Sequence, residues 1–389
     1  MATSELPTLR WGIVGCGLIS SWFVADLCLA DRPGATTKHI VQAVASSSKS
    51  KGSTFVSKHC PSQQPTVYDS YQDLYNDPNV DIVYIGTPHV VHCENTLDAI
   101  AVGKHVLCEK PVAVNSRDAK KMIDAAREKG VFLMEAVWTR FFPITTKLNS
   151  LLYEEKIIGD IAAVFVDFGL NMPIGKADPT TRVASKALGA GALLDIGIYS
   201  LTWASIILDK SPSRQTNTSP DMSATMTFHN EKLDIAERID EQVTAVLRYS
   251  DLKAQAICSA SLLYKSGAEF ARIEGSKGSI SVGGVAASKP GYLVIRVQDE
   301  EEERLDFEVP GFGFHYEADA VAEDIRAGRQ ENATCSWSDT TTIMSRLDAI
   351  RSTCGLTYPQ DASVHRQSRD FIQWVRGYSH ILLSSATQN

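Results

Sequence analysis

The first third of the chain alternates short apolar runs with stretches in which apolar residues recur every three to four positions. We predict strands at LRWGIV (9–14), HIVQAVAS (39–46), TVY (66–68), DIVYIGT (81–87), HVLCEK (105–110) and VFLMEAV (131–137). The helical candidates between them are 18–30, 50–59, 70–76, 91–102 and 116–129. Strand–helix alternation with Val- and Ile-rich runs is typical of a doubly wound parallel sheet with helices on both faces.

The pattern changes after residue 137. A helix at 143–156, a strand at 161–169 and a helix at 191–208 come first, and the polar stretch 209–221 is predicted to be a surface loop. Strands are then predicted at 244–249, 254–262, 270–275, 278–284, 292–297 and 304–309, followed by helices at 315–327, 338–353 and 370–383. Short glycine-containing or acidic turns between strands indicate an open, mostly antiparallel sheet.

These patterns predict two domains. Residues 1–136 form an α/β Rossmann domain, and residues 137–389 form an α+β domain with a large open sheet. The 389-residue chain carries a net charge of -8, which argues against nucleic acid or an anionic membrane as partner. Its eight cysteines include no CxxC pair, so we expect reduced thiols and a cytoplasmic location.

One stretch, 11–30, is apolar enough to suggest a membrane anchor. Asp26 interrupts it, and Gly12, Gly15 and Gly17 crowd its start, so we favour a different interpretation. Gly15-Cys16-Gly17-Leu18-Ile19-Ser20 follows the first strand and opens a helix, which is the context of a dinucleotide-binding loop. Gly15 allows the tight turn, Gly17 lets the backbone approach a pyrophosphate, and the helix start at Leu18 and Ile19 supplies N–H groups.

The end of the second strand indicates which dinucleotide is bound. NAD enzymes place an acidic residue there for the ribose 2′-hydroxyl. This chain instead has Ser46-Ser47-Ser48-Lys49-Ser50-Lys51. Hydroxyl and ammonium groups suit a 2′-phosphate, so the sequence favours NADP, with a Ser/Lys-rich surface turn as the alternative.

Two further strand ends face the same crevice. The fourth strand ends in Thr87-Pro88-His89 with His92 one turn later, and the fifth ends in Glu109-Lys110-Pro111. A lysine there can hydrogen-bond a substrate hydroxyl or relay its proton, although it can also be a solvated loop lysine. His89, His92 and Cys93 lack a metal-ligating partner from a third strand, so no metal site is predicted.

Five segments in this order resemble the glucose-fructose oxidoreductase / inositol dehydrogenase (Gfo/Idh/MocA) family: GIVGCGLIS, IGTPHVVH, CEKP, FLMEAVWTRFFP and GAGALLDIGIY. RIEGSKGSI (272–280) and FHYEADAVAEDIRAGR (314–329) extend the resemblance into the C-terminal domain. The nearest branches are NADP-dependent D-xylose dehydrogenases, glucose-fructose oxidoreductases and dimeric dihydrodiol dehydrogenases. The resemblance implies a homodimer formed through the C-terminal sheet.

The resemblance also implies roles for individual residues. It assigns Lys110 as the catalytic lysine, Tyr199 as the acid/base and Asp195 as a substrate-orienting carboxylate. Asp195 and Tyr199 are four positions apart, so on a helix they share a face. We expect a nearby lysine and the oxidised nicotinamide to favour the Tyr199 phenolate. Asp195 capping a helix and Tyr199 packing in the core remain the alternatives.

The remaining candidates lie around this centre. The resemblance places Trp138 and Arg140 at the cofactor and Ser46 and Lys51 at the 2′-phosphate, whereas Arg182 is expected to bind substrate or the Asp195 carboxylate. Trp138, Phe141 and Phe142 are either sugar-stacking or core residues. The predicted cofactor contacts are Gly15, Gly17, Leu18, Ile19, Ser46, Ser47, Lys51, Thr87, Pro88, His89, His92, Glu109, Lys110, Trp138 and Arg140, and the predicted substrate contacts are Lys110, Trp138, Arg182, Asp195 and Tyr199.

The predicted reaction is hydride transfer from C1 of an aldose, D-xylose or D-glucose, to NADP, which gives the lactone. Three alternatives are oxidation of a trans-dihydrodiol, transhydrogenation between an aldose and a ketose on a retained NADP, and dinucleotide binding without turnover, as in regulatory members of the family. Retention of both Lys110 and Tyr199 argues against the last.

Overall fold

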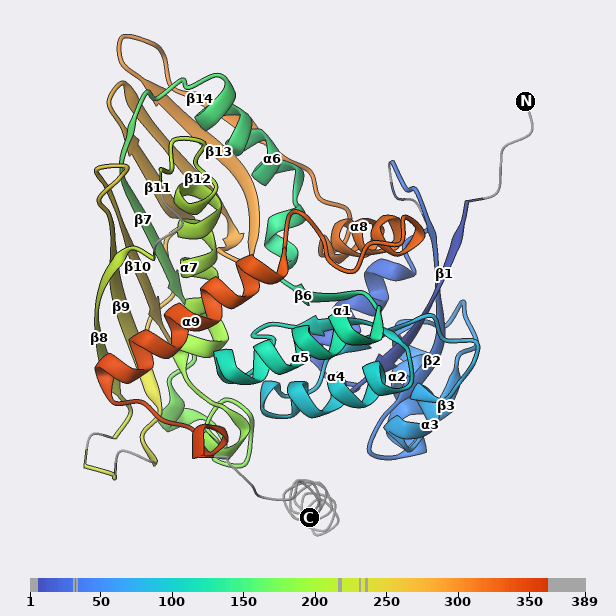
Figure 1. The fold of residues 1–389 in the computed structure, drawn as a ribbon. Helices are drawn as coiled ribbons and strands as arrows, with labels where there is room; N and C mark the ends of the chain where they lie inside the picture. Colours follow the sequence, from blue (N-terminus) through green and yellow to red (C-terminus); the bar gives the residue numbers. More distant parts are fainter. Residues whose placement is uncertain are drawn as a thin grey trace, which may run out of the picture.

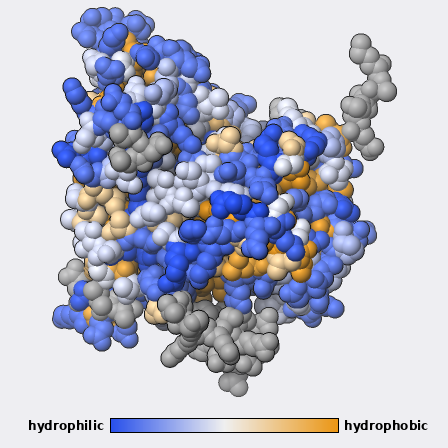
Figure 2. Space-filling model, viewed as in Figure 1, coloured by the Kyte–Doolittle hydropathy of each residue, from blue (hydrophilic) through white to orange (hydrophobic). Residues whose placement is uncertain are grey.

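The computed structural model describes residues 6–362, except 31, 33, 216–218, 231 and 235–236. Two sheets lie side by side, and the chain passes from one to the other after β6 and returns through its last helices (Figure 1). The helix predicted at 370–383 lies outside the described residues. Hydrophilic residues cover most of the face shown in Figure 2.

The first sheet has the strand order β3-β2-β1-β4-β5-β6, and every neighbouring pair is parallel. Its strands are β1 (Thr8–Val14), β2 (Lys38–Ala45), β3 (Thr66–Tyr68), β4 (Ile82–Ile85), β5 (His105–Glu109) and β6 (Leu133–Ala136). Its helices are α1 (Leu18–Leu27), α2 (Lys49–His59), α3 (Tyr71–Tyr75), α4 (His92–Ala101) and α5 (Ser116–Lys129). The order reverses between β1 and β4, and ligands of such sheets bind at the carboxyl ends of the strands near this reversal.

The second sheet has the order β14-β13-β12-β11-β7-β10-β9-β8. Its strands are β7 (Ile161–Gly169), β8 (Asp221–Phe228), β9 (Asp240–Tyr249), β10 (Ala254–Ser261), β11 (Glu269–Gly275), β12 (Gly278–Ala286), β13 (Lys289–Val297) and β14 (Glu303–Asp306). Only the central β7–β10 pair is parallel, so the predicted open, mostly antiparallel sheet is confirmed.

Two details of this sheet differ from the prediction. Strand β8 was not predicted, because its alternating small and polar residues (DMSATMTF) contain few large apolar side chains. Strand β14 ends at Asp306, although the alternation of Leu305, Phe307 and Val309 predicted a strand to 309. These three side chains are only partly buried, so a short edge strand suffices to pack them.

The helical segments of the second domain before β8 are α6 (Pro143–Asn149), a π-helical turn η3 (Ser150–Glu154), 3₁₀ turns η4 (Ile174–Lys176) and η5 (Lys186–Leu188), then η6 (Leu193–Gly197), α7 (Ile198–Ala204) and η7 (Ser205–Asp209). Of these, α6, η6 and α7 pack against the second sheet. In the described part of the chain, the run Lys186–Asp209 is the one helix long and apolar enough to cross a membrane, but 94% of its apolar window is buried inside the protein. It is the core helix of this layer. The apolar stretch 11–30 likewise folds into buried β1 and α1.

The last helices, α8 (Phe314–Arg326) and α9 (Trp337–Cys354), pack back on the first domain (Figure 1). Asp26 at the end of α1 accepts backbone N–H groups from Phe312, Gly313 and Phe314 at 2.7–3.1 Å. The Trp337 indole donates to Leu133 O of β6 at 2.9 Å. Segments far apart in sequence therefore hold the two sheets in one orientation.

Candidate active site

The loop after β1 has the geometry that its glycines predict. Gly15 adopts φ +92°, and a Cβ there would lie 2.9 Å from Gly86 O, so only glycine fits without strain. Its N–H donates to Ala45 O at 3.0 Å, which ties the loop to the end of β2. Gly17 is exposed and is the N-cap of α1.

The start of α1 is suited to a phosphate. No acidic residue lies in its first turn, and no side chain caps it. The N–H groups of the first turn of a helix have no partner within the helix, so they are available to an anion. Leu18, 67% exposed, and half-buried Ile19 lie at this opening.

The end of β2 offers hydroxyl and ammonium groups to a second phosphate. Ser46 is buried, and its Oγ has no hydrogen-bond partner in the described part of the chain. Ser47 and Lys51 are exposed beside it, and Ser48 caps α2 by accepting the Lys51 backbone N–H at 3.3 Å. The residues present fit a nucleotide with a 2′-phosphate.

Backbone groups hold the two histidines after β4. His92 bridges strand ends, with Nε2 2.8 Å from Thr87 O and Nδ1 2.9 Å from Pro111 O. His89 Nε2 lies 2.9 Å from Gly189 O, which connects η1 (His89–Val91) to the second domain. Burial lowers the pKa of His89 to about 3 and of His92 to about 4, so both are neutral at physiological pH.

No cluster of three potential metal ligands occurs among the described residues. His89 and His92 contact backbone carbonyl oxygens through their ring nitrogens, so their side chains are fixed in place along the crevice. Asn95 donates to Thr87 Oγ1 at 3.1 Å and fixes the end of β4 in the same way.

Lys110, Asp195 and Arg182 form a charged cluster where the two domains meet. Lys110 Nζ donates to Asp195 O at 2.6 Å and lies 3.4 Å from Asp195 Oδ1. Arg182 NH1 donates to the same Oδ1 at 3.0 Å, with 43% of the Arg182 side chain exposed. Burial opposes ionisation of Asp195, but Lys110 and Arg182 outweigh it and hold its pKa well below the ordinary value. The structure thus brings together three of the predicted substrate residues.

Tyr199 lies next to this cluster and is 4% exposed. Lys110 Nζ is 4.9 Å from the centroid of its ring, and its hydroxyl accepts the Trp138 indole N–H at 2.9 Å. Burial, with the nearby Glu109 carboxyl, raises the pKa of Tyr199 well above its ordinary value. The expected stabilisation of the phenolate by Lys110 is not observed, because the ammonium group faces the ring and binds Asp195 instead of the phenol oxygen.

Glu109 points into the core of the first domain. Tyr84 OH donates to its Oε1 at 2.7 Å, and the Lys110 backbone N–H donates to its Oε2 at 3.2 Å. Burial raises the pKa of Glu109 to about 7. Its cofactor contact therefore stays a prediction, while its observed partners fix the backbone that carries Lys110.

The aromatic residues predicted to stack on sugar are mostly core residues. Trp138 is sandwiched in the interior, with its ring 4.1 Å from that of Phe314 and almost parallel to it. Phe142 is fully buried, and only Phe141 is partly exposed. Arg140 is buried and its charge acts on Glu135 and Asp339, and its predicted cofactor contact stays a prediction.

Three residues near the site were not predicted. Phe168 at the end of β7 packs edge-on against Tyr199, with ring centroids 5.6 Å apart. Glu135 accepts the Val112 N–H and the Thr340 hydroxyl beneath the Glu-Lys-Pro segment. Glu317 is completely buried in α8. Its position on the apolar face of an amphipathic pattern was a signal that sequence reasoning did not use.

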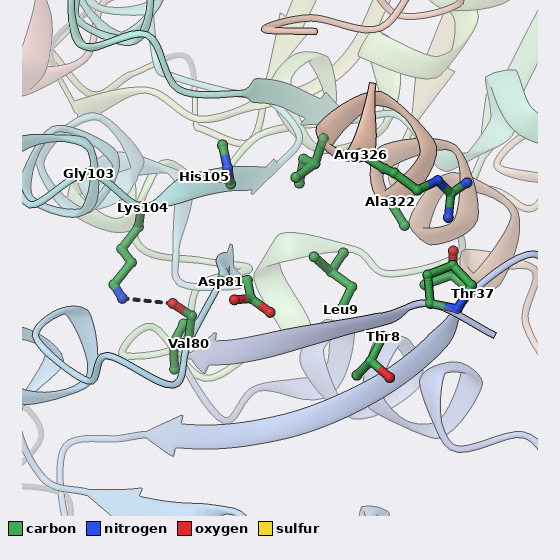
Figure 3. A pocket seen from close by; sticks show the side chains of 12 residues that line it. Thr8, Leu9, Thr37, Val80, Asp81, Gly103, Lys104, His105, Ala322 and Arg326 are labelled. Atoms are coloured by element: carbon green, nitrogen blue, oxygen red, sulfur yellow. Dashed lines mark hydrogen bonds between the residues drawn. The ribbon is translucent and has the colours of Figure 1, made fainter. Parts of the chain in front are cut away.

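A surface cavity of about 360 Å³ lies at the amino ends of the strands of the first sheet, and Figure 3 shows the side chains that line it. Two of its charged side chains are already engaged: Asp81 pairs with Arg10, and Lys104 donates to Asp77 O and Val80 O, each at 2.7 Å. It contains neither the glycine loop nor the Lys110 cluster, so we place the chemistry at the carboxyl ends of the strands.

The site combines three features: a glycine loop at the sheet reversal, hydroxyl and ammonium groups after β2, and a lysine–carboxylate cluster. Together they are the features of a dinucleotide-dependent oxidoreductase. The profile of an oxidoreductase family with an NAD-binding Rossmann fold matches residues 9–137, and the GFO/IDH/MocA C-terminal domain matches residues 150–281. The chain belongs to the GFO/IDH/MocA oxidoreductase family.

Two kinds of characterised relative cover nearly the whole chain. It is 32% identical to D-xylose 1-dehydrogenase (NADP(+)) of Hypocrea jecorina, over 92% of this chain and 95% of the relative. It is 33% identical to trans-1,2-dihydrobenzene-1,2-diol dehydrogenase of Homo sapiens, over 91% and 99%. The aldose-aldose oxidoreductase of Caulobacter crescentus has the same fold, with TM-score 0.74, 23% identity and coverage of 90% of this chain and 98% of that one.

Proposed function

We propose that the protein is an NADP-dependent sugar dehydrogenase that oxidises C1 of an aldose, D-xylose or D-glucose, to the lactone. The observation that carries this proposal is the cluster of Lys110, Asp195 and Arg182 beside the glycine loop. Two cations and a carboxylate provide donors and acceptors for a substrate rich in hydroxyl groups. The D-xylose dehydrogenase relative supports the substrate class and the cofactor.

NADP is the proposed cofactor, and when bound it supplies the hydride acceptor. Gly15, Gly17 and the first turn of α1 would hold its pyrophosphate, and Ser46 and Lys51 its 2′-phosphate. His89 and His92 are neutral, so they would add no positive charge to a nicotinamide bound at this crevice.

Three side chains have separate roles in the proposed reaction. Lys110 donates a hydrogen bond to the substrate hydroxyl and polarises it. Tyr199, in the ionised form that its burial disfavours, accepts the hydroxyl proton as the C–H bond breaks. Asp195, kept ionised by its two cations, accepts hydrogen bonds from neighbouring hydroxyls and orients the ring. Because Lys110 already bonds to Asp195, an incoming hydroxyl shares existing partners rather than leaving a buried charge unpaired.

Ser46→Asp should weaken NADP binding by about 5- to 150-fold, because it removes a hydroxyl and places a carboxylate against the 2′-phosphate. Fluorescence titration gives Kd for NADP and NAD. Ser57→Asp adds the same charge at an exposed position of α2 and is the matched control. A wild-type enzyme with higher kcat/KM for NAD than for NADP contradicts the 2′-phosphate assignment.

Substrate class is tested by comparing kcat/KM for D-xylose, D-glucose and trans-dihydrodiols on one preparation. We expect the better aldose to be at least about tenfold more efficient, because a dihydrodiol leaves more of the buried polar groups unpaired at about 1–3 kcal/mol each. A preference for the dihydrodiol would overturn the sugar assignment. Because Trp138 and Phe142 are buried, we expect the charged residues to discriminate between the two substrate classes.

The dihydrodiol relative is as similar as the xylose relative, so trans-dihydrodiol oxidation is the second candidate. Transhydrogenation on a retained NADP is a third. It predicts that bound cofactor is reduced by an aldose and reoxidised only when a ketose such as fructose is added. The dimer through the second sheet and the cytoplasmic location stay predictions.

A further inference from the structure

Glu317 is a buried acid for which the mechanism above has no use. It lies in α8 with none of its surface exposed. Neither of its carboxyl oxygens has a hydrogen-bond partner among the residues that the structure describes. Burying an unpaired carboxylate is costly, so a group in this position calls for a physical explanation.

A chain of side-chain contacts leads from Phe314, on the same helix as Glu317, to Tyr199. Trp138 donates to the Tyr199 hydroxyl, and the Trp138 ring stacks on Phe314 at 4.1 Å. Phe314 contacts Phe23 edge-on, Phe23 stacks on Tyr84 at 3.9 Å, and Tyr84 donates to Glu109. Glu317 comes three residues after Phe314, so it lies on the same face of α8 as that ring.

The groups whose charge couples to Glu317 come from five elements and are all neutral or acidic: Asp26 of α1, Tyr84 of β4, Glu109 of β5, Tyr199 of α7 and Cys335 before α9. Burial and the carboxyls of Glu109 and Asp26 raise the pKa of Glu317 well above its ordinary value. Lys110 is engaged with Asp195, and the Asp26 carboxylate is engaged with the start of α8. Full burial, the lack of a hydrogen-bond partner among the described residues and the neighbouring carboxyls all favour the protonated form of Glu317.

We propose that Glu317 is a positioning residue that acts through Tyr199: its uncharged carboxyl allows the phenol to lose its proton, and its ionisation opposes that loss. The proposal rests on the proposed role of Tyr199 as the proton acceptor. The two acids titrate as a coupled pair, because a negative charge on either one disfavours a charge on the other. Glu317 then determines at which pH the enzyme gains its active base.

The first test is the pH dependence of kcat for Glu317→Gln, which is permanently uncharged. We expect turnover near neutral pH to stay within about threefold of the wild type and the midpoint of the alkaline rise to move about one pH unit lower, the scale of a like-charge interaction inside a protein. Glu317→Asp keeps an ionisable group and should restore the wild-type midpoint. Glu323→Gln, at an exposed position of α8, is the matched control.

A purely structural role predicts a different result: Glu317→Gln and Glu317→Asp both lose activity or stability at every pH while the midpoint stays in place. That outcome overturns the proposal. If Glu317→Gln does not fold, the midpoint of Glu317→Asp and the second test still distinguish the proposal from a purely structural role.

The second test is an infrared pH titration of the folded wild-type protein without substrate. We expect a protonated carboxyl signal that persists after the Glu109 carboxyl has titrated near pH 7, and Glu109→Gln identifies the Glu109 signal. Its absence overturns the proposal. This measurement needs no turnover, so a protein that oxidises no sugar refutes the proposed function without affecting the result on Glu317.

Discussion

Tyr199→Phe and Lys110→Met should each lower kcat by about 10²–10⁴, the usual loss on removing a positioned proton-transfer group. The Tyr199→Phe variant would lack the proposed proton acceptor, and the Lys110→Met variant would lack the ammonium group that bonds Asp195. The Kd for NADP should change little, because the Lys110 ammonium contacts the second domain instead of the phosphate-binding loop. Steady-state kinetics with the preferred aldose, together with fluorescence titration of NADP, separates the two effects.

Tyr292→Phe and Lys120→Met are matched controls outside the site, since Lys120 is 70% exposed on α5 and Tyr292 lies on β13. Both should retain wild-type kcat. Near-normal turnover by Tyr199→Phe would show that another group accepts the proton. Asp195 and His89, which lie against the same cluster, would then be replaced next.

Asp26→Ala should lower the free energy of unfolding by about 3–5 kcal/mol, as is typical when one partner of a buried charge network is removed. Asp26 is 1% exposed, and its carboxylate accepts three backbone N–H groups at the start of α8. Without it these donors have no partner in a buried position. Urea unfolding followed by circular dichroism measures the loss.

Asp124→Ala is the control for this stability measurement, because Asp124 pairs with Lys120 and Arg127 on the surface of α5, where such pairs contribute about 0–1 kcal/mol. A loss for Asp26→Ala as small as that of the control would mean that solvent or a rearranged chain satisfies the three N–H groups. The bond network at Asp26 would then not hold α8 on the first domain.

Asp26 illustrates what sequence reasoning misses. In the sequence it only interrupted an apolar stretch and argued against a membrane anchor, whereas in the structure it joins α1 to α8. Its partners lie almost three hundred positions away, at separations of 286–288 residues. Local periodicity carries no information on contacts of that range.

Local chemistry predicted much of the rest. The strand–helix alternation predicted the parallel sheet, because strands and helices have different periods of apolar residues and each period can be recognised within its own segment. The glycine loop was predictable because its glycines are contiguous with the end of the first strand, where Gly15 adopts φ +92°. The close approach of Gly86 O comes from the neighbouring strand β4 and is a tertiary contact. The absence of an acid between Ser46 and Lys51 was also visible in the sequence alone.

The sequence by itself thus determined the two-sheet fold class, the glycine loop and the identity of the charged residues near the candidate site. Only the tertiary structure decided their environment: Trp138 became a core residue bonded to Tyr199, and Lys110 came to bond Asp195. The physical reason is that burial and the direction of a side chain depend on packing between α7, α8 and the first sheet. These elements meet only when the whole chain has folded.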